Sequence, residues 1–103
     1  MSLTNAFETH ALQYLLTTDS LTRPTAWYVA LFTSDPTDTG TAGTEVSTGT
    51  GYARTSVAFS VSGDTATNSA AVEFPAASGG SWGTVSHIGV MDASTGGNMI
   101  VHA

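Results

Sequence analysis

Acidic side chains gather between residues 34 and 51, and they are the first candidates for chemistry in this chain. Asp35, Asp38 and Glu45 lie there among threonines and glycines, and carboxylate oxygens in loops are ligands that Ca²⁺ accepts. Their spacing matches no recognisable calcium-binding loop, and Asp-Pro and Asp-Thr-Gly are common turn sequences. We therefore expect no calcium ion here and interpret the three acids as candidate contact residues.

Histidines are the second candidates, as zinc ligands. The chain has three, of which His10 falls in a predicted helix and His87 and His102 fall in two separate predicted strands. A zinc site needs ligands at close spacing or in a recognisable motif, and no cysteine is present to complete one. We predict neither a metal nor a cofactor.

Catalytic groups show no convincing pattern. The members of a Ser-His-Asp triad all occur in the chain, and Asp64, Glu73 and Asp92 could supply the paired carboxylates of a glycosidase. The sequence alone places no two of these acids at one groove. We predict no catalytic residues and a protein that is not an enzyme.

Charge and length set further limits. The 103 residues include two arginines, no lysine and eight carboxylates, for a formal net charge of −6. Arg23 and Arg54 cannot neutralise several phosphates, so we expect no nucleic-acid partner. No apolar run approaches the length of a membrane span, and we find no signal-peptide pattern, so we expect no membrane partner. The length indicates a single β-rich domain, residues 1–103.

A helix is predicted at about residues 5–16. Asn5 followed by Glu8 has the spacing of a capping box, and the polar residues 17–19 mark the end of the helix. Apolar residues recur at helical spacing and form one stripe. We expect this stripe to lie on the sheet or on a neighbouring subunit, because so short a helix is marginal alone. The stripe consists of Phe7, Ala11, Leu12, Leu15 and Leu16.

Strand patterns fill the rest of the chain. The run from Trp27 to Phe32 is apolar on both faces, which predicts a strand covered on both sides. The fold class is mainly β: a small antiparallel β-sandwich or rolled sheet of about five strands with one N-terminal α-helix. The last predicted strand has no following partner, so its edge needs a cover. Turn sequences separate the further strands, which are predicted at residues 52–61, 70–74, 84–92 and 98–102.

Two kinds of side chain leave alternatives open. Aromatic residues such as Tyr52 and Trp82 suit either a core or interface, or a platform that stacks on sugar rings. Their burial would favour a scaffold, and their exposure beside polar groups would favour glycan binding. Arg54 lies close in sequence to Glu45, and we expect a salt bridge that ties the loop to the sheet.

Motifs along nearly the whole chain resemble a family of small bacteriophage virion proteins, usually described as tail fibre or minor tail proteins. This resemblance implies a virion component made in the host cytoplasm. The motifs that carry it are the N-terminal helix, Tyr28–Gly40, Glu45-Val46, Gly51–Arg54, Asn68–Pro75, Ser81–Gly89 and Asp92–Gly97.

The combined hypothesis is a non-enzymatic structural component of a virion, associated with the tail or its fibres. Hydroxyl-rich surfaces are cheap to desolvate, and lysine, which protects sheet edges, is absent. We therefore expect other virion proteins and further copies of the chain as partners. The alternatives are a host-glycan-binding module and a capsid decoration protein. The candidate interface residues are Phe7, Leu15, Asp35, Asp38, Glu45, Tyr52 and Trp82.

Overall fold

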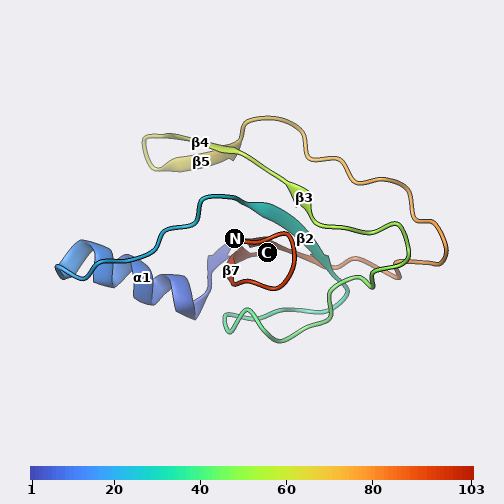
Figure 1. The fold of residues 1–103 in the computed structure, drawn as a ribbon, viewed down its shortest axis with the longest axis horizontal. Coiled ribbons are helices and arrows are strands. Elements are labelled where there is room, and N and C mark those ends of the chain that lie inside the picture. Colours follow the sequence, from blue (N-terminus) through green and yellow to red (C-terminus); the bar gives the residue numbers. More distant parts are fainter.

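The computed structural model describes all 103 residues and confirms a mainly β, antiparallel fold with one N-terminal helix (Figure 1). Five strands form one sheet in the order β1-β7-β6-β2-β3, and two more form a separate hairpin. The elements in chain order are β1 (Ser2–Leu3), α1 (Asn5–Leu16), β2 (Tyr28–Phe32), β3 (Thr55–Ser56), β4 (Phe59–Ser62), β5 (Thr65–Asn68), β6 (His87–Met91) and β7 (Met99–His102).

Strand β2 is held along both of its edges. One edge pairs with β6 along its whole length, and the other pairs first with β3 and then with loop residues 44–46. The two faces of β2 differ, because Ala30 and Phe32 are buried whereas Val29 and Leu31 are only half-buried. The expectation of full cover on both faces therefore holds for one face only, since the separate hairpin does not pack on the other.

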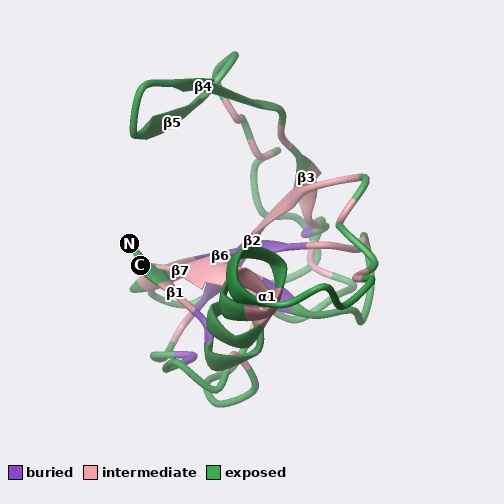
Figure 2. Ribbon diagram, turned by 90° about the vertical axis from the view of Figure 1, so that its left-hand side faces the viewer, coloured by how far each residue is buried: buried purple, intermediate pink, exposed green.

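A small core lies where β2, β6 and β7 meet. Ala30, Phe32, Met91 and Met99 form its buried cluster (Figure 2). Gly89 leaves room for this cluster, because a Cβ atom there would lie 2.5 Å from Cε of Met99. Only ten of the 103 residues are buried, so this single layer supplies much of the apolar stabilisation of the chain.

The N-terminal strand covers the last strand of the chain. Strand β1 pairs with the end of β7, so the cover expected for that edge comes from the chain itself. The next residue, Thr4, is 1% exposed. Its hydroxyl donates to the carbonyl of Met99 at 2.7 Å, and its N–H donates to the carbonyl of Ile100 at 2.9 Å. Strand β1 was not predicted, because two residues are too few to show an alternation.

Helix α1 spans the predicted residues but begins with a different cap. Thr4 is the N-cap residue, and its side chain makes no capping bond because its hydroxyl bonds to β7. Asn5 is the first helical residue, and its N–H donates to the carbonyl of Asp38 at 2.8 Å. The capping box predicted from Asn5 and Glu8 is therefore wrong.

The leucines of α1 do not lie on the sheet of their own chain. The helix approaches β7 only at its start and then runs away from the sheet (Figure 1). Leu12, Leu15 and Leu16 are 59%, 73% and 76% exposed. Their predicted docking on the sheet is wrong for a single chain, and their docking on a neighbouring subunit stays a prediction. The helix is too short and too weakly apolar to cross a membrane.

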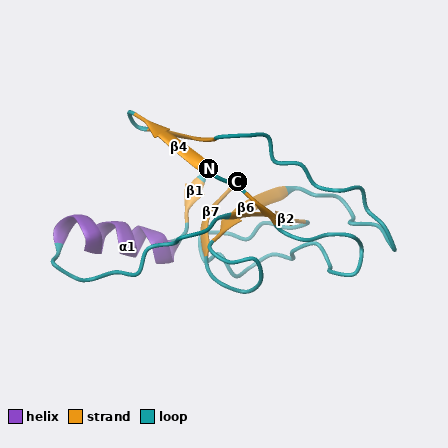
Figure 3. Ribbon diagram, turned by 45° about the horizontal axis from the view of Figure 1, so that its top comes forward, coloured by secondary structure: helices purple, strands orange, loops and turns teal.

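Strands β4 and β5 form a hairpin apart from the main sheet (Figure 3). One strand was predicted at residues 52–61, but the chain changes partner within it, since β3 pairs with β2 and β4 pairs with β5. The strand predicted at residues 70–74 is wrong. The turn at Gly63, where φ is 61°, sets the hairpin register. The last backbone bond of the hairpin runs from the N–H of Ser69 to the carbonyl of Ala58, and residues 70–74 form no strand.

Replacing Met99 by alanine tests the position of the core. The change removes buried contacts and leaves a cavity, so we expect the free energy of unfolding to fall by about 2–5 kcal/mol. Leu15→Ala is the contrasting variant, and in dilute solution it should change that free energy by less than about 0.5 kcal/mol, because the side chain is exposed. Urea denaturation followed by circular dichroism measures both. Equal losses would contradict the assignment of the core.

Candidate functional site

Glu45, Tyr52 and Arg54 form a tightly bonded polar cluster, here called the arginine clamp. The Arg54 guanidinium donates from Nε to Oε2 of Glu45 and from Nη2 to Oε1, each at 2.9 Å. The Tyr52 hydroxyl donates to Oε2 at 2.5 Å. The Arg54 side chain is 9% exposed and that of Glu45 is 27% exposed. The salt bridge predicted between these residues is therefore present, and its two-pronged geometry makes it one of the stronger kinds of ion pair.

The clamp joins segments that are far apart in the sequence. Nη1 of Arg54 donates to the carbonyls of Ala93 and Gly96, at 2.9 and 2.8 Å, in the turn between β6 and β7. The Tyr52 hydroxyl accepts a bond from the N–H of Leu31 in β2 at 3.1 Å. One guanidinium and one phenol thus hold the long loop, the central strand and the β6–β7 turn together.

The clamp also shifts the protonation equilibria of its members. Burial alone would raise the pKa of Glu45, but hydrogen bonds from Arg54 and Tyr52 and the charge of Arg54 outweigh it and lower the pKa below its ordinary value of 4.5. Burial and the bond to Glu45 raise the pKa of Tyr52 above its ordinary value of 10.0. Hydrogen bonding to Glu45 raises the pKa of Arg54. The cluster is therefore an ion pair beside a neutral phenol at neutral pH.

Few groups of the clamp are free to take part in a reaction. Both oxygens of Glu45 accept hydrogen bonds, and each nitrogen of Arg54 donates at least one. A hollow of about 260 Å³ adjoins the clamp and is lined also by Ser94 and Thr95, but by no histidine and no second acid. The arrangement is suited to holding segments in place.

One loop segment, Gly79–Gly83, has the Gly-x-Ser-x-Gly spacing of a hydrolase nucleophile. In hydrolases that turn joins a strand to a helix and exposes the serine. Here the segment lies in the loop between β5 and β6, and no helix follows it. The Ser81 hydroxyl accepts a bond from the N–H of Gly83 at 3.0 Å. The spacing therefore does not produce a nucleophile turn.

Three aromatic rings pack beside the clamp. Tyr52 stacks on Phe74 with ring centroids 6.1 Å apart, and Trp82 meets both rings edge-on. Tyr52 is 6% exposed, and Trp82 is half-buried and donates from Nε1 to the carbonyl of Thr50 at 2.8 Å. Phe74 was not predicted as a site residue. The only sequence feature that pointed to its burial was its position two residues after Val72, on the same face of the predicted strand. Burial of Tyr52 favours a scaffold role for these rings over a sugar-stacking platform.

The other two acids of the loop have separate surroundings. Oδ1 of Asp35 accepts a turn bond from the N–H of Thr37 at 2.9 Å. Oδ1 of Asp38 lies 2.8 Å from Nε2 of His102 on β7, a contact that sequence analysis missed because the two residues are 64 positions apart. No three histidine, aspartate or glutamate side chains come close enough together to hold a metal ion.

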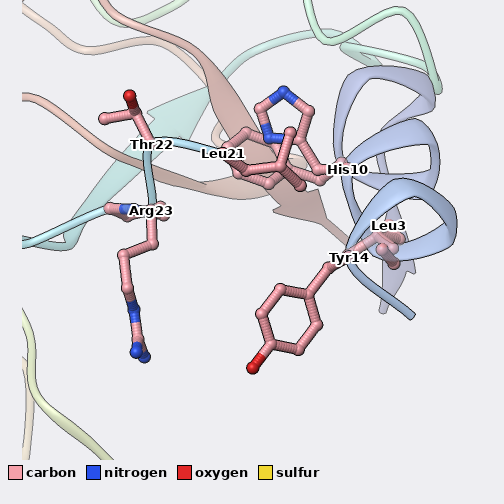
Figure 4. Close-up of a pocket in the computed structure, with 9 residues that line it drawn as sticks. Leu3, His10, Tyr14, Leu21, Thr22 and Arg23 are labelled. Atoms are coloured by element: carbon pink, nitrogen blue, oxygen red, sulfur yellow. The ribbon is translucent and has the colours of Figure 1, made fainter. Parts of the chain in front are cut away.

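Helix α1 and the segment after it enclose a mostly apolar groove of about 440 Å³ (Figure 4). Phe7 packs edge-on against His10, with ring centroids 4.8 Å apart, and both line the groove. Tyr14 extends from the helix and Arg23 from the segment that follows it. Of the two helix residues predicted for an interface, Phe7 lines the groove and Leu15 does not.

The seven residues predicted for an interface do not form one patch. Glu45, Tyr52 and Trp82 come together in and beside the clamp. The remaining four, spread over the helix and the loop, are Phe7, Leu15, Asp35 and Asp38. An interface role for all seven stays a prediction. The carbonyls of Ala93 and Gly96, which complete the clamp, could not be found from the sequence because backbone acceptors leave no residue-type signal.

Replacing Arg54 by lysine tests the clamp. Lysine keeps the charge but loses the planar fork that serves several acceptors at once. We expect the free energy of unfolding to fall by about 2–3 kcal/mol, less than for a fully buried pair because Glu45 is partly exposed. Arg23→Lys is the matched control at the other, exposed arginine and should change stability by less than about 0.5 kcal/mol. Thermal and urea unfolding measure both variants, and an equal loss of stability in the two would count against the clamp.

The clamp also predicts how stability depends on pH. Because the folded-state pKa of Glu45 is lowered, its contribution is present above the ordinary value of 4.5 and is lost as the pH falls further. Because the folded-state pKa of Tyr52 is raised, its contribution is complete below 10.0 and is lost as the pH rises beyond that. Glu45→Gln should flatten the acid side of a profile of urea midpoints, and Tyr52→Phe the alkaline side. Unchanged slopes in these variants would refute the linkage.

The chain matches the family model described as podophage GP4 fiber I protein gp80 over residues 2–103. No curated protein matches it. The match covers nearly the whole chain and confirms the resemblance to phage tail fibre proteins. The chain belongs to the family of the podophage GP4 fiber I protein gp80.

Proposed function

We propose that this chain is a non-enzymatic subunit of a phage tail fibre whose fold is completed by contacts with further copies and with other virion proteins. Membership of a phage fibre family makes it a structural component of the virion. We also propose that the fibre is part of the tail and takes part in attachment to the host. The family description favours a fibre over a capsid decoration protein.

The observation that carries the proposal is the large surface that the chain leaves uncovered. The accessible surface is 6480 Å², whereas a compact monomer of 10.5 kDa exposes about 5,400 Å². The radius of gyration is 14.6 Å, against about 12.8 Å for a compact domain of this length. A chain that exposes so much more surface than its mass requires is suited to burying that surface against neighbours.

Unpaired backbone groups support the same proposal. The chain makes 39 backbone–backbone hydrogen bonds, whereas roughly 70 are usual for a globular protein of this length. Long segments, including the one between β5 and β6, run without a partner strand (Figure 1). Such segments can gain hydrogen bonds from an adjacent chain by strand addition.

The absence of a catalytic role is part of the proposal, and the clamp supports it because its hydrogen-bonding groups are already occupied. Glycan binding through the aromatic cluster is less well supported. Tyr52 is buried against Phe74, so it offers no open face, and the indole N–H of Trp82 is already bonded to Thr50, so it is not free to bind a sugar hydroxyl.

The mass of the purified chain in solution tests the proposal. We expect light scattering after size-exclusion chromatography to give a multiple of 10.5 kDa that grows with concentration, because the uncovered surface is then buried between copies. Electron cryomicroscopy of the particle should place the chain in a tail fibre. A chain that stays monomeric at high concentration, or that lies on the capsid, would refute the proposal.

A further inference from the structure

Two arms project from the body of the molecule on the same side. One is the hairpin of β4 and β5, here called the hairpin arm, and the other is the second half of α1, residues 12–16, here called the helix arm (Figures 1 and 2). The strands of the hairpin pair extensively only with each other, and the helix runs away from the sheet after its start (Figure 1). Both arms are therefore unsupported in a single chain.

The hairpin arm has one apolar face and one hydroxyl face. Val61 lies opposite Ala66 in the pairing, and Phe59 is on the same face because it is two residues from Val61. This apolar face is open to solvent, with Val61 73% exposed. A two-stranded hairpin alone is marginally stable in water and needs a third layer on its apolar face. The opposite face consists of Ser60, Ser62, Thr65 and Thr67.

The helix arm presents a matching surface. Leu12, Leu15 and Leu16 are spaced to share one face of the helix and are each more than half exposed. A helix of 12 residues is also marginal in water without an apolar face to pack on. Each arm thus lacks a layer of the kind that the other could supply.

Charge and area favour a second copy as the occupant. The helix arm carries no charged side chain, and the hairpin arm carries only Asp64 at its turn, so two copies of a chain with net charge −6 can meet here without facing acids. A basic partner would find no acidic surface to recognise on these faces. The chain exposes about 1,000 Å² more than a compact monomer of its mass, and a standard interface covers about 800 Å² on each partner.

Resting on the fibre-subunit function proposed above, we propose that the hairpin arm of one copy packs on the helix arm of the next copy. Phe59 and Val61 would lie against Leu12, Leu15 and Leu16 of the neighbour. The two surfaces are different, so the contact is of the head-to-tail kind, and every copy carries both halves of it. Repetition of the contact closes a ring or extends a filament.

Mixed single-cysteine variants test the contact, because the chain has no cysteine of its own. One preparation carries Val61→Cys and the other Leu15→Cys, and they are mixed in the folded state and oxidised. We expect a disulfide-linked dimer containing one copy of each variant, identified by mass spectrometry. Thr67→Cys on the hydroxyl face of the same hairpin is the matched control and should give at least about fivefold less mixed dimer, since its side chain points away. Circular dichroism checks that each variant is folded.

A charge substitution gives a second, independent measurement. Val61→Asp buries a carboxylate in the proposed contact and should raise the dissociation constant at least tenfold by sedimentation, whereas Thr67→Asp should leave it within about twofold. Two results would overturn the hairpin-on-helix contact. One is a dimer that forms only between two Val61→Cys copies, and the other is an equal yield of mixed dimer from Val61→Cys and Thr67→Cys. If the chain forms oligomers of unchanged affinity in Val61→Asp, this contact fails while the fibre-subunit function stands. A wild-type chain that is monomeric at all concentrations would overturn both.

Discussion

The fold depends on one guanidinium group. Arg54 is bonded to a loop carboxylate and to two carbonyls of the β6–β7 turn, and its neighbour Tyr52 is bonded to the central strand. These segments are too polar and too rich in glycine to bury an apolar core of their own. A partly buried ion pair with four directional bonds from Arg54 takes the place of that core. The buried cluster around Met99 stabilises the packing of β2, β6 and β7, and the clamp stabilises the loops.

Such an arrangement leaves a rigid centre with unsupported extensions. The clamp and the small core fix β2, β6, β7 and the loops that cross them, while α1 and the β4–β5 hairpin extend beyond these contacts. Ordering an extension costs conformational entropy that apolar burial normally offsets. In a single chain that burial is missing from both arms, and the proposed contact with a neighbouring copy would supply it. The fibre family to which the chain belongs gives that neighbour a natural source.

Local signals predicted much of the fold, and long-range contacts account for what was missed. The helix and the apolar strand at β2 were visible because each depends on residues close in sequence. The helix cap was mispredicted because Thr4 bonds to β7, at the other end of the chain. The strand at 70–74 has a suitable pattern but no partner, and a strand exists only in a pair. The Glu45–Arg54 pair was found since its members are close in sequence, whereas the acceptors at Ala93 and Gly96 were not.

Charge placement differs between the bonded centre of the molecule and its two arms. Glu45 is neutralised inside the clamp, and Asp38 lies against His102 on β7, so two of the eight carboxylates have positive or titratable partners within the chain. The apolar faces of the two arms carry no carboxylate. Repulsion between acids elsewhere on the surface fades over about 8 Å at physiological ionic strength, whereas apolar contact acts only where surfaces touch. An acidic chain built in this way discourages random association and still permits association through the uncharged apolar faces of its arms.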